Sequence, residues 1–298
     1  MGKRSMSAWN VSDWGKGMKI RQEVKRKIVQ IAAFGFSNSY LCNFAGGQLY
    51  KGRWKQFCNP GMNCYSCPAA RLSCPIGAMQ AVSGSMNFSV SFYVTGFVLA
   101  VGVLFGRAVC GFVCPFGLIQ ELLYKIPFPK KKLWKGFIYV KYILLAFFVL
   151  LLPVIHTNEL GMGAPAFCEY ICPVGTLEGG LPLLATHPEL RKVVGALFSV
   201  KACILALTLV GCLAICRFFC KVMCPLGAIY GILNKISLYH MEVDKERCIS
   251  CGQCHAECPM DVDPVKTPDS AECIRCGKCT ACCPKEALAL KFRFMDFR

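Results

Sequence analysis

The sequence has 298 residues, 55% of them hydrophobic, and a mean hydropathy of +0.45. This composition is too apolar for an ordinary soluble domain and predicts several membrane spans. The formal net charge of +17 treats the 23 cysteines as neutral. Because each four-thiolate iron–sulfur cluster adds about −2, the basic balance is weak evidence for nucleic acid, and we expect no nucleic-acid partner.

Residues 1–27 are polar and basic, with eight lysines and arginines. No small-residue cleavage site follows the next apolar run, so a secretory signal is a poor interpretation. We expect residues 1–27 to form a cytoplasmic arm.

Four apolar segments follow the arm and predict an all-α bundle of four transmembrane helices within residues 28–238. Lysine and arginine are most frequent in the arm and in the loop 107–136, which has six. Since cytoplasmic loops are richer in these residues, both termini are expected in the cytoplasm of a multi-pass inner-membrane protein. The four segments are 28–50, 88–105, 137–155 and 193–214.

A short phrase, Cys-Pro-x-Gly, recurs four times among these segments and is typical of an iron–sulfur ligand that precedes a helix. Proline suits the first helical position, where free N–H groups stabilise an anion. With the expected topology, two copies lie at each membrane face, in two related halves of the chain. The phrases begin at Cys74, Cys114, Cys172 and Cys224, and three of them have a further cysteine four residues upstream, at Cys110, Cys168 and Cys220.

The tail, residues 239–298, contains two Cys-x2-Cys-x2-Cys-x3-Cys-Pro runs and predicts a small α+β ferredoxin domain with two [4Fe–4S] clusters. In such runs the fourth cysteine binds the cluster of the other run. Structural zinc, the alternative, would not explain the doubled run with both prolines. One cluster would be held by Cys248, Cys251, Cys254 and Cys283, the other by Cys273, Cys276, Cys279 and Cys258, leaving Cys282 as a buried thiol.

The inner face offers four thiolates, the number that one [4Fe–4S] cluster needs: Cys110, Cys114, Cys220 and Cys224. The i, i+4 spacing places each pair on one side of a helical turn. The alternative is four buried free thiols. Cys216 continues one row and is expected only to pack.

The outer face offers six cysteines, two more than one cluster needs. One solution is a sequential set of four from the first outer loop. Another joins the pair in the second outer loop to Cys74 and to either Cys64 or Cys67, and a third has two clusters that share these residues with a non-cysteine ligand. Disulfides are the alternative in an oxidising exterior, including a switch between Cys64 and Cys67. The six are Cys58, Cys64, Cys67, Cys74, Cys168 and Cys172, whereas Cys42, Cys203 and Cys212 are expected to pack in apolar helices.

Polar side chains near the span ends are candidates for a quinone site: His156, Glu159 and His187. Ordinary interfacial solvation is the simpler interpretation. Two histidines also suit a haem, but their context is not diagnostic.

From the motif Gly106-Arg107-x2-Cys110-x3-Cys114-Pro115 and its second copy at Arg217, residues 85–298 resemble membrane-anchored polyferredoxins. They are similar to the NapH-type subunit of periplasmic nitrate reductase systems and to the membrane half of the nitrous oxide reductase regulator. The resemblance implies four helices, a ferredoxin tail and electron transfer with a quinol pool in anaerobic respiration. The cysteine-rich outer loops depart from it, as does the lack of a flavin-binding domain.

Together these features predict a membrane-bound electron carrier, a component of an oxidoreductase rather than a stand-alone catalyst. Its expected partners are redox proteins, membrane lipid and a quinone. A redox sensor or maturation factor is the alternative, and an assembly subunit of a larger redox complex is the third hypothesis.

Overall fold

The computed structural model describes residues 11–83, 89–155 and 163–293 and is mostly helical, with one small sheet. The first half contains α1 (Val11–Ser37), α2 (Asn43–Gly46), η1 (Arg53–Gln56), α3 (Pro75–Ser83), α4 (Ser89–Phe105), α5 (Ala108–Phe112), α6 (Pro115–Tyr124), η2 (Lys135–Tyr139), α7 (Val140–Leu144), η3 (Leu145–Leu151) and α8 (Leu152–Ile155). The second half contains η4 (Phe167–Ile171), α9 (Pro173–Gly175), η5 (Thr176–Gly180), α10 (Leu181–Thr186), η6 (Pro188–Val193), α11 (Ala196–Ala214), α12 (Phe218–Val222), α13 (Pro225–Leu233), β1 (Tyr239–Val243), α14 (Gln253–Ala256), α15 (Lys278–Cys282) and β2 (Leu288–Phe292).

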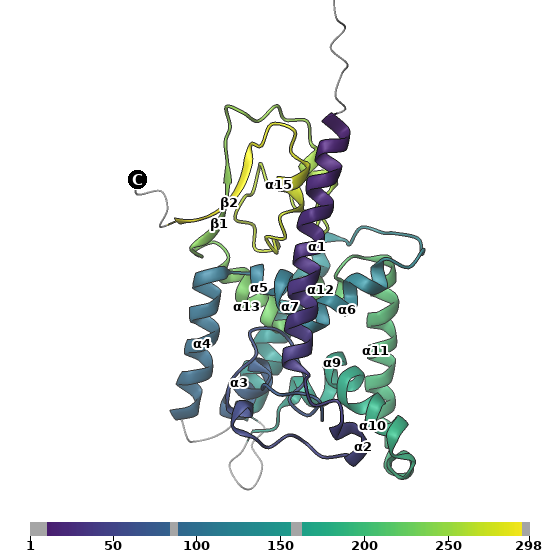
Figure 1. Cartoon of the computed structure of the whole chain (residues 1–298). Coiled ribbons are helices and arrows are strands. Elements are labelled where there is room, and N and C mark those ends of the chain that lie inside the picture. The colour runs from purple at the N-terminus through teal and green to yellow at the C-terminus, as the bar shows by residue number, and fades with distance from the viewer. Residues whose placement is uncertain (1–10, 84–88, 156–162, 294–298) are drawn as a thin grey trace, which may run out of the picture.

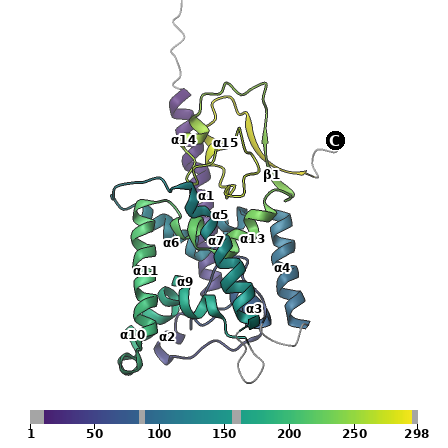
Figure 2. The same cartoon turned by 180° about the vertical axis from the view of Figure 1, so that it is seen from behind.

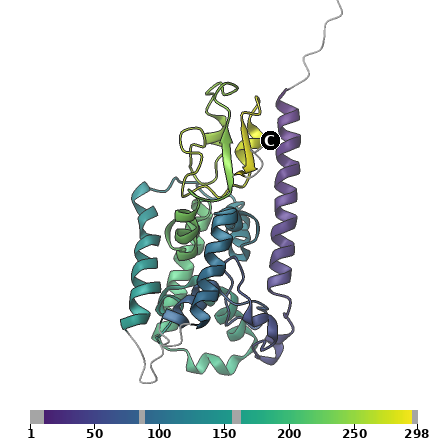
Figure 3. The ribbon, with the colours of Figure 1, turned by 90° about the vertical axis from the view of Figure 1, so that its left-hand side faces the viewer.

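Helix α1 differs from the expected division between an arm and a first span. It runs without interruption from Val11 to Ser37, across the predicted boundary at residue 27, and residues 38–50 leave it for a loop and the short α2. The segment 28–50 is therefore not one membrane-length helix, because polar residues end the helix at Ser37. Figure 3 shows α1 standing alongside both the ferredoxin tail and the helical part.

The prediction of four membrane spans is wrong by length and hydropathy. Within the described ranges, two helices are long and apolar enough to cross a membrane, Lys135–Ile155 and Ala196–Ala214. The first is the continuous series η2–α7–η3–α8, with a π-helical middle. The described apolar part of α4, Tyr93–Phe105, is shorter than a span.

Large apolar side chains are exposed along both long helices. Ile143 and Ile155 on the first are 63% and 66% exposed, and Leu207 on α11 is 65% exposed. Such contiguous apolar surface marks contact with lipid or protein, since soluble monomers rarely expose it. Figure 2 shows α11 and α4 on opposite sides of the helical part.

The four Cys-Pro phrases each precede a helix, as the sequence predicts. Pro75, Pro115, Pro173 and Pro225 are the first residues of α3, α6, α9 and α13. The preceding cysteine pairs do not lie on one regular helical turn, however. The N–H of Cys114 donates to Val109 O at 3.2 Å, and those of Cys172 and Cys224 donate to the carbonyls five residues back. The chain thus turns sharply between the two cysteines of each pair.

The tail folds over one end of the helical part (Figure 1). Its sheet pairs β1 with β2 antiparallel, with Tyr239 opposite Phe292 and Val243 opposite Leu288. Short helices α5, α12 and α13 lie at the tail end of the helical part, whereas α3, α9 and α10 lie towards the other end (Figure 1). This order along the molecule positions the cysteine sets described next.

Candidate metal centres

The first cysteine set of the tail surrounds a pocket of about 260 Å³. Two of its members come from the loop before α14, the third lies in α14, and the fourth precedes the loop to β2. The pocket opens towards solvent, because Ile249 is 58% exposed and Cys251 is exposed. The cysteines that line it are Cys248, Cys251, Cys254 and Cys283.

The second cysteine set of the tail lines a smaller, tighter pocket, of about 20 Å³. Backbone N–H groups donate to its sulfurs, from Val262 to Cys258 and from Arg275 to Cys273, each at 3.4 Å. Hydrogen bonds of this kind tune iron–sulfur clusters. The cysteines that line the pocket are Cys258, Cys273, Cys276 and Cys279.

A third set, here named the near quartet, lies beneath the tail in α5, α12 and the starts of α6 and α13. Its members are Cys110, Cys114, Cys220 and Cys224, all of them buried. Burial raises the pKa of Cys224, and the three other thiols of the quartet raise it further, so the sulfurs lie close together. The N–H of Gly227 donates to Cys224 Sγ at 3.2 Å.

Two buried arginines cross-connect the halves of the near quartet. Arg107, three residues before Cys110, donates to Cys220 O at 3.1 Å. Arg217, three residues before Cys220, donates to Cys110 O. Each arginine therefore holds the cysteine helix of the opposite half.

Buried charge around the near quartet is unbalanced towards the positive. Arg107 shares Glu272 with Lys141, and Glu121 receives three cations, Arg26, Lys27 and Arg217. Five cations thus face two carboxylates, and Arg107 Nε is buried without a hydrogen-bond partner in the described residues. Since buried charge must be compensated, this surplus fits an anionic group held by the four thiolates.

A fourth set, here named the far quartet, lines a pocket of about 290 Å³ between the first cysteine-rich loop, α3 and α9. Burial raises the pKa of Cys172, and the three other thiols of this set raise it further. Its members are Cys64, Cys74, Cys168 and Cys172.

The far quartet has a buried carboxyl where the near quartet has cations. Glu178 Oε2 accepts a hydrogen bond from Cys64 N at 2.9 Å, and its Oε1 has no partner in the described residues. Burial raises the pKa of Glu178 to about 8, although the Cys64 N–H favours the ionised form. Lys201 also lines the pocket and donates to Cys168 O at 3.1 Å.

Two cysteines of the predicted outer group do not line this pocket. Cys67 packs with Ala69 and Ala70. The backbone of Cys58 pairs with that of Ser73 in an isolated parallel β-bridge. All 23 cysteines lie in the described ranges, and none is in a disulfide there. Nor does any group of three or more His, Cys, Asp or Glu in these ranges suit a single metal ion.

Close backbone contacts connect neighbouring sets. A Cβ on Gly111 would lie 2.7 Å from Ile274 O, so α5 touches the loop of the second tail set. A Cβ on Gly61 would lie 2.7 Å from Cys114 Cα. Met62, the next residue, lines the far pocket, and although burial raises the pKa of the Cys114 thiol, the backbone amide of Met62 lowers it. The loop 58–64 therefore reaches from the far quartet to the near quartet.

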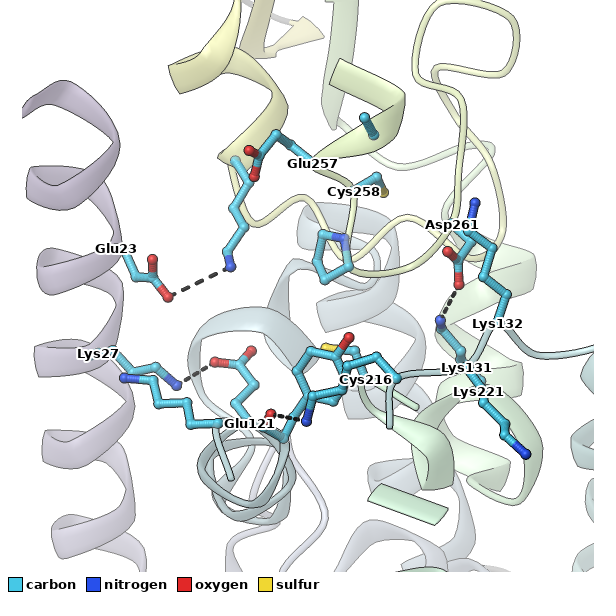
Figure 4. Close-up of a pocket in the computed structure, with 16 residues that line it drawn as sticks. Glu23, Lys27, Glu121, Lys131, Lys132, Cys216, Lys221, Glu257, Cys258 and Asp261 are labelled. Carbon is cyan, nitrogen blue, oxygen red and sulfur yellow. Dashed lines mark hydrogen bonds and ion pairs between the residues drawn. The ribbon is translucent and has the colours of Figure 1, made fainter. Parts of the chain in front are cut away.

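A lysine-rich pocket of about 390 Å³ opens between α1, α6 and the tail, beside Cys258 (Figure 4). Seven lysines and four acidic residues line it. At its floor Glu121 is paired with Lys27, and Lys221 is paired with Asp261 at 2.7 Å (Figure 4). Cys216 lines this pocket and lies outside both quartets.

Sequence reasoning did not assign the buried polar residues that brace the quartets. Arg107 and Arg217 occupy the same position, three residues before the first cysteine of a pair, and this repeat was the available signal. Gln80 and Gln120, each six residues after the cysteine of a Cys-Pro phrase, were missed in the same way. Of the polar candidates for a quinone, His187 Nε2 contacts Phe44 O at 3.2 Å, and His156 and Glu159 lie outside the described residues.

Comparison with known proteins identifies related sequences. A family model described as a 4Fe-4S binding domain matches residues 86–135, 142–182 and 197–240, and a second of the same description matches 241–262. The protein named Putative electron transport protein YccM, from Escherichia coli, is 24% identical over 54% of this chain and 43% of its own length. The methylamine utilization ferredoxin-type protein MauN of Methylorubrum extorquens is 29% identical over 63% of this chain and 60% of its own length. No solved structure matches.

The archaeal relative named Uncharacterized protein MJ0750, from Methanocaldococcus jannaschii, is 31% identical over 66% of this chain and 77% of its own length. The 4Fe-4S matches and the four cysteine sets agree with iron–sulfur electron transfer. The chain belongs to the same family as this archaeal relative and contains 4Fe-4S binding domains.

Proposed function

We propose that this chain is a membrane-bound electron-transfer protein with four [4Fe–4S] clusters in series. The observation that carries the proposal is the close approach of successive cysteine sets, through Gly111 and Ile274 and then through Gly61 and Cys114. A [4Fe–4S] cluster supplies one-electron redox chemistry when it is bound by four thiolates. The protein holds each set in place and keeps water from the buried near quartet.

The ligands proposed for the tail are the two sets that line its pockets. For the helical part they are the near quartet and the far quartet, with Cys64 completing the latter. The support for Cys64 over Cys67 is its place in the pocket with Cys74, Cys168 and Cys172. Cys58 and Cys67 then pack without binding metal.

Membrane attachment is proposed through Lys135–Ile155 and Ala196–Ala214, whose exposed apolar side chains would contact lipid. The tail would lie in the cytoplasm, where a soluble redox protein exchanges electrons at the exposed loop around Cys251. The resemblance to NapH-type subunits suggests the same arrangement, in which a series of clusters exchanges electrons with a quinone pool in the membrane.

A quinone is the lipid-soluble partner we propose, bound in an apolar groove of about 530 Å³. Val109 and Val113 of this groove precede Cys110 and Cys114 in the chain, and Tyr239 also lines it. Replacing Val101, which lines the groove, with Trp is expected to block reduction by a quinol analogue while dithionite still reduces the protein. Equal quinol rates in both proteins would reject this site.

Iron and sulfide analysis with EPR on anaerobically purified protein tests the whole proposal. About 16 irons per chain are expected, from four clusters of four. About 12 irons would reject one of the two quartets, and about eight would leave only the tail sites. Tail spectra alone, with no further signal on reduction, would reject the transmembrane series.

A further inference from the structure

Two buried glutamines occupy equivalent positions in the two quartets. Gln80 lies in α3, six residues after Cys74, and Gln120 lies in α6, six residues after Cys114. Both side chains are fully buried. Each helix begins at the proline of its Cys-Pro phrase, so the same spacing turns both glutamines towards the cysteine pair of the other half.

The contacts of the two amides are alike. Gln120 Nε2 lies 3.2 Å from Cys220 Sγ, and Gln80 Nε2 lies 3.2 Å from Cys168 Sγ. Cys220 and Cys168 are both the first cysteine of a Cys-x3-Cys-Pro pair. In each case a glutamine from one arm of the quartet therefore reaches a sulfur of the other arm.

Backbone donors fix which end of each amide faces the sulfur. Gln80 Oε1 accepts from Phe167 N at 2.8 Å, and Gln120 Oε1 accepts from Cys220 N at 3.4 Å. Because an N–H must face an oxygen, the NH2 group is left to face the sulfur. Each amide thus donates to sulfur and accepts from the backbone beside it.

The equivalent positions after Cys172 and Cys224 serve another purpose. Glu178 accepts from Cys64 N at 2.9 Å, and Tyr230 donates to Pro60 O at 2.9 Å. Both side chains hold the loop 58–64 and leave the sulfur contacts to the glutamines. In each quartet, therefore, the side chain at this position contacts a sulfur from one arm and holds the loop 58–64 from the other.

We propose that Gln120 and Gln80 are positioning residues that set the reduction potentials of the near and far clusters through hydrogen bonds to Cys220 Sγ and Cys168 Sγ. The inference rests on the proposed function, since it needs a cluster at each quartet. Hydrogen bonds to cluster sulfurs favour the reduced, more negative form and so raise the potential. Loss of one such bond lowers the potential of that cluster alone.

The test is an EPR-monitored redox titration of the full-length, anaerobically purified protein with Gln120→Met or Gln80→Met. Methionine has a similar length and volume but no donor. We expect the near cluster in Q120M, and the far cluster in Q80M, to become harder to reduce by about tenfold, which is about 59 mV for a one-electron couple. The other three clusters keep their wild-type potentials.

Gln30→Met is the matched control. Gln30 is also a fully buried glutamine near the near quartet, but its Nε2 donates to Gly111 O at 2.8 Å and, within the described residues, to no sulfur. The reduction potentials of the clusters in Q30M should equal those of the wild type. A shift in Q30M as large as that in Q120M would overturn the inference, because it would reflect packing instead of the sulfur bond.

Other outcomes separate the inference from the proposed function. Wild-type protein with only eight irons would reject the clusters themselves. Full iron content with unchanged potentials in Q120M and Q80M would reject the glutamine role alone. If a methionine variant loses its cluster, wild-type protein with 15N in the glutamine side-chain amide decides: pulsed EPR should detect coupling of the amide nitrogen to each quartet's cluster, and no coupling would overturn the inference.

Discussion

The near and far quartets share one plan, but their surroundings differ in charge. Both combine cysteines from two Cys-Pro arms, and both are braced by a glutamine from one arm. Arginines and lysines outnumber carboxylates around the near quartet, whereas a buried carboxyl with a raised pKa, Glu178, lies beside the far quartet. The comparison teaches that the repeated phrase determines where the cysteines lie, and that residues outside the phrase determine the charge around them.

The largest expected effect comes from replacing one cysteine in each of the two Cys-Pro arms of the near quartet. Cys110→Ser with Cys220→Ser should lower the iron content by about four per chain and leave the tail signals unchanged. Both serines lie in the buried quartet, so no exposed thiol replaces the lost ligands. Iron analysis with EPR measures this, and an unchanged iron content would reject the near quartet as a cluster site.

Two substitutions in one loop, at Cys64 and Cys67, test the far quartet. Cys64→Ser should also lower the iron content by about four, because Cys64 lines the pocket with the other far thiols. Cys67→Ser is the control and should retain full iron, since Cys67 packs against Ala69 and Ala70. The reverse result would assign the fourth position to Cys67.

Neutralising the two buried carboxyls should have unequal effects on stability. Glu121→Gln leaves three cations without their shared partner and should destabilise the protein by about 3–5 kcal/mol. Glu178→Gln should cost less than about 1 kcal/mol, because this carboxyl has no cation partner in the described residues and the amide oxygen can still accept from Cys64. Thermal unfolding in detergent measures both, and equal losses would contradict the contrast in charge.

The Glu121 carboxyl also makes the stability of the protein depend on pH. Burial alone would raise the pKa of Glu121, but Arg217 and Arg26 more than offset burial and hold it well below its usual range. Its contribution to stability is therefore present above the unfolded pKa of about 4.3 and is lost as the pH falls further. Between pH 5 and pH 3 the wild-type protein should lose more stability than Glu121→Gln, and parallel unfolding curves for the two proteins would contradict this.

The smallest effect is expected for the cysteines outside the four sets. Cys203 on α11 is exposed and Cys42 precedes α2, so replacing either with serine should change stability by no more than about 0.5 kcal/mol. Their iron content should equal that of the wild type. Loss of iron in either variant would show that a quartet extends beyond its pocket.

Much of this organisation follows from the sequence because ligand spacing is local. The prolines after Cys74 and Cys224 predict helix starts, and the paired tail runs predict which cysteines share a pocket. The spans could not be predicted as well: the apolar run after residue 28 suggested a helix to Tyr50, but Ser37 and Asn38 end it. Nor could spacing choose between Cys64 and Cys67, because that choice depends on how the loop 58–64 packs against the distant Cys114.

The packing of the tail over the near quartet bears on how a cluster could be inserted there. The four near cysteines are 3–5% exposed, and the backbone at Ile274 lies against Gly111. The tail follows the cysteines of both quartets in the sequence. If the near quartet holds the cluster proposed above, iron and sulfide must reach it before the tail packs over it, and the cluster would then be inserted before the tail docks.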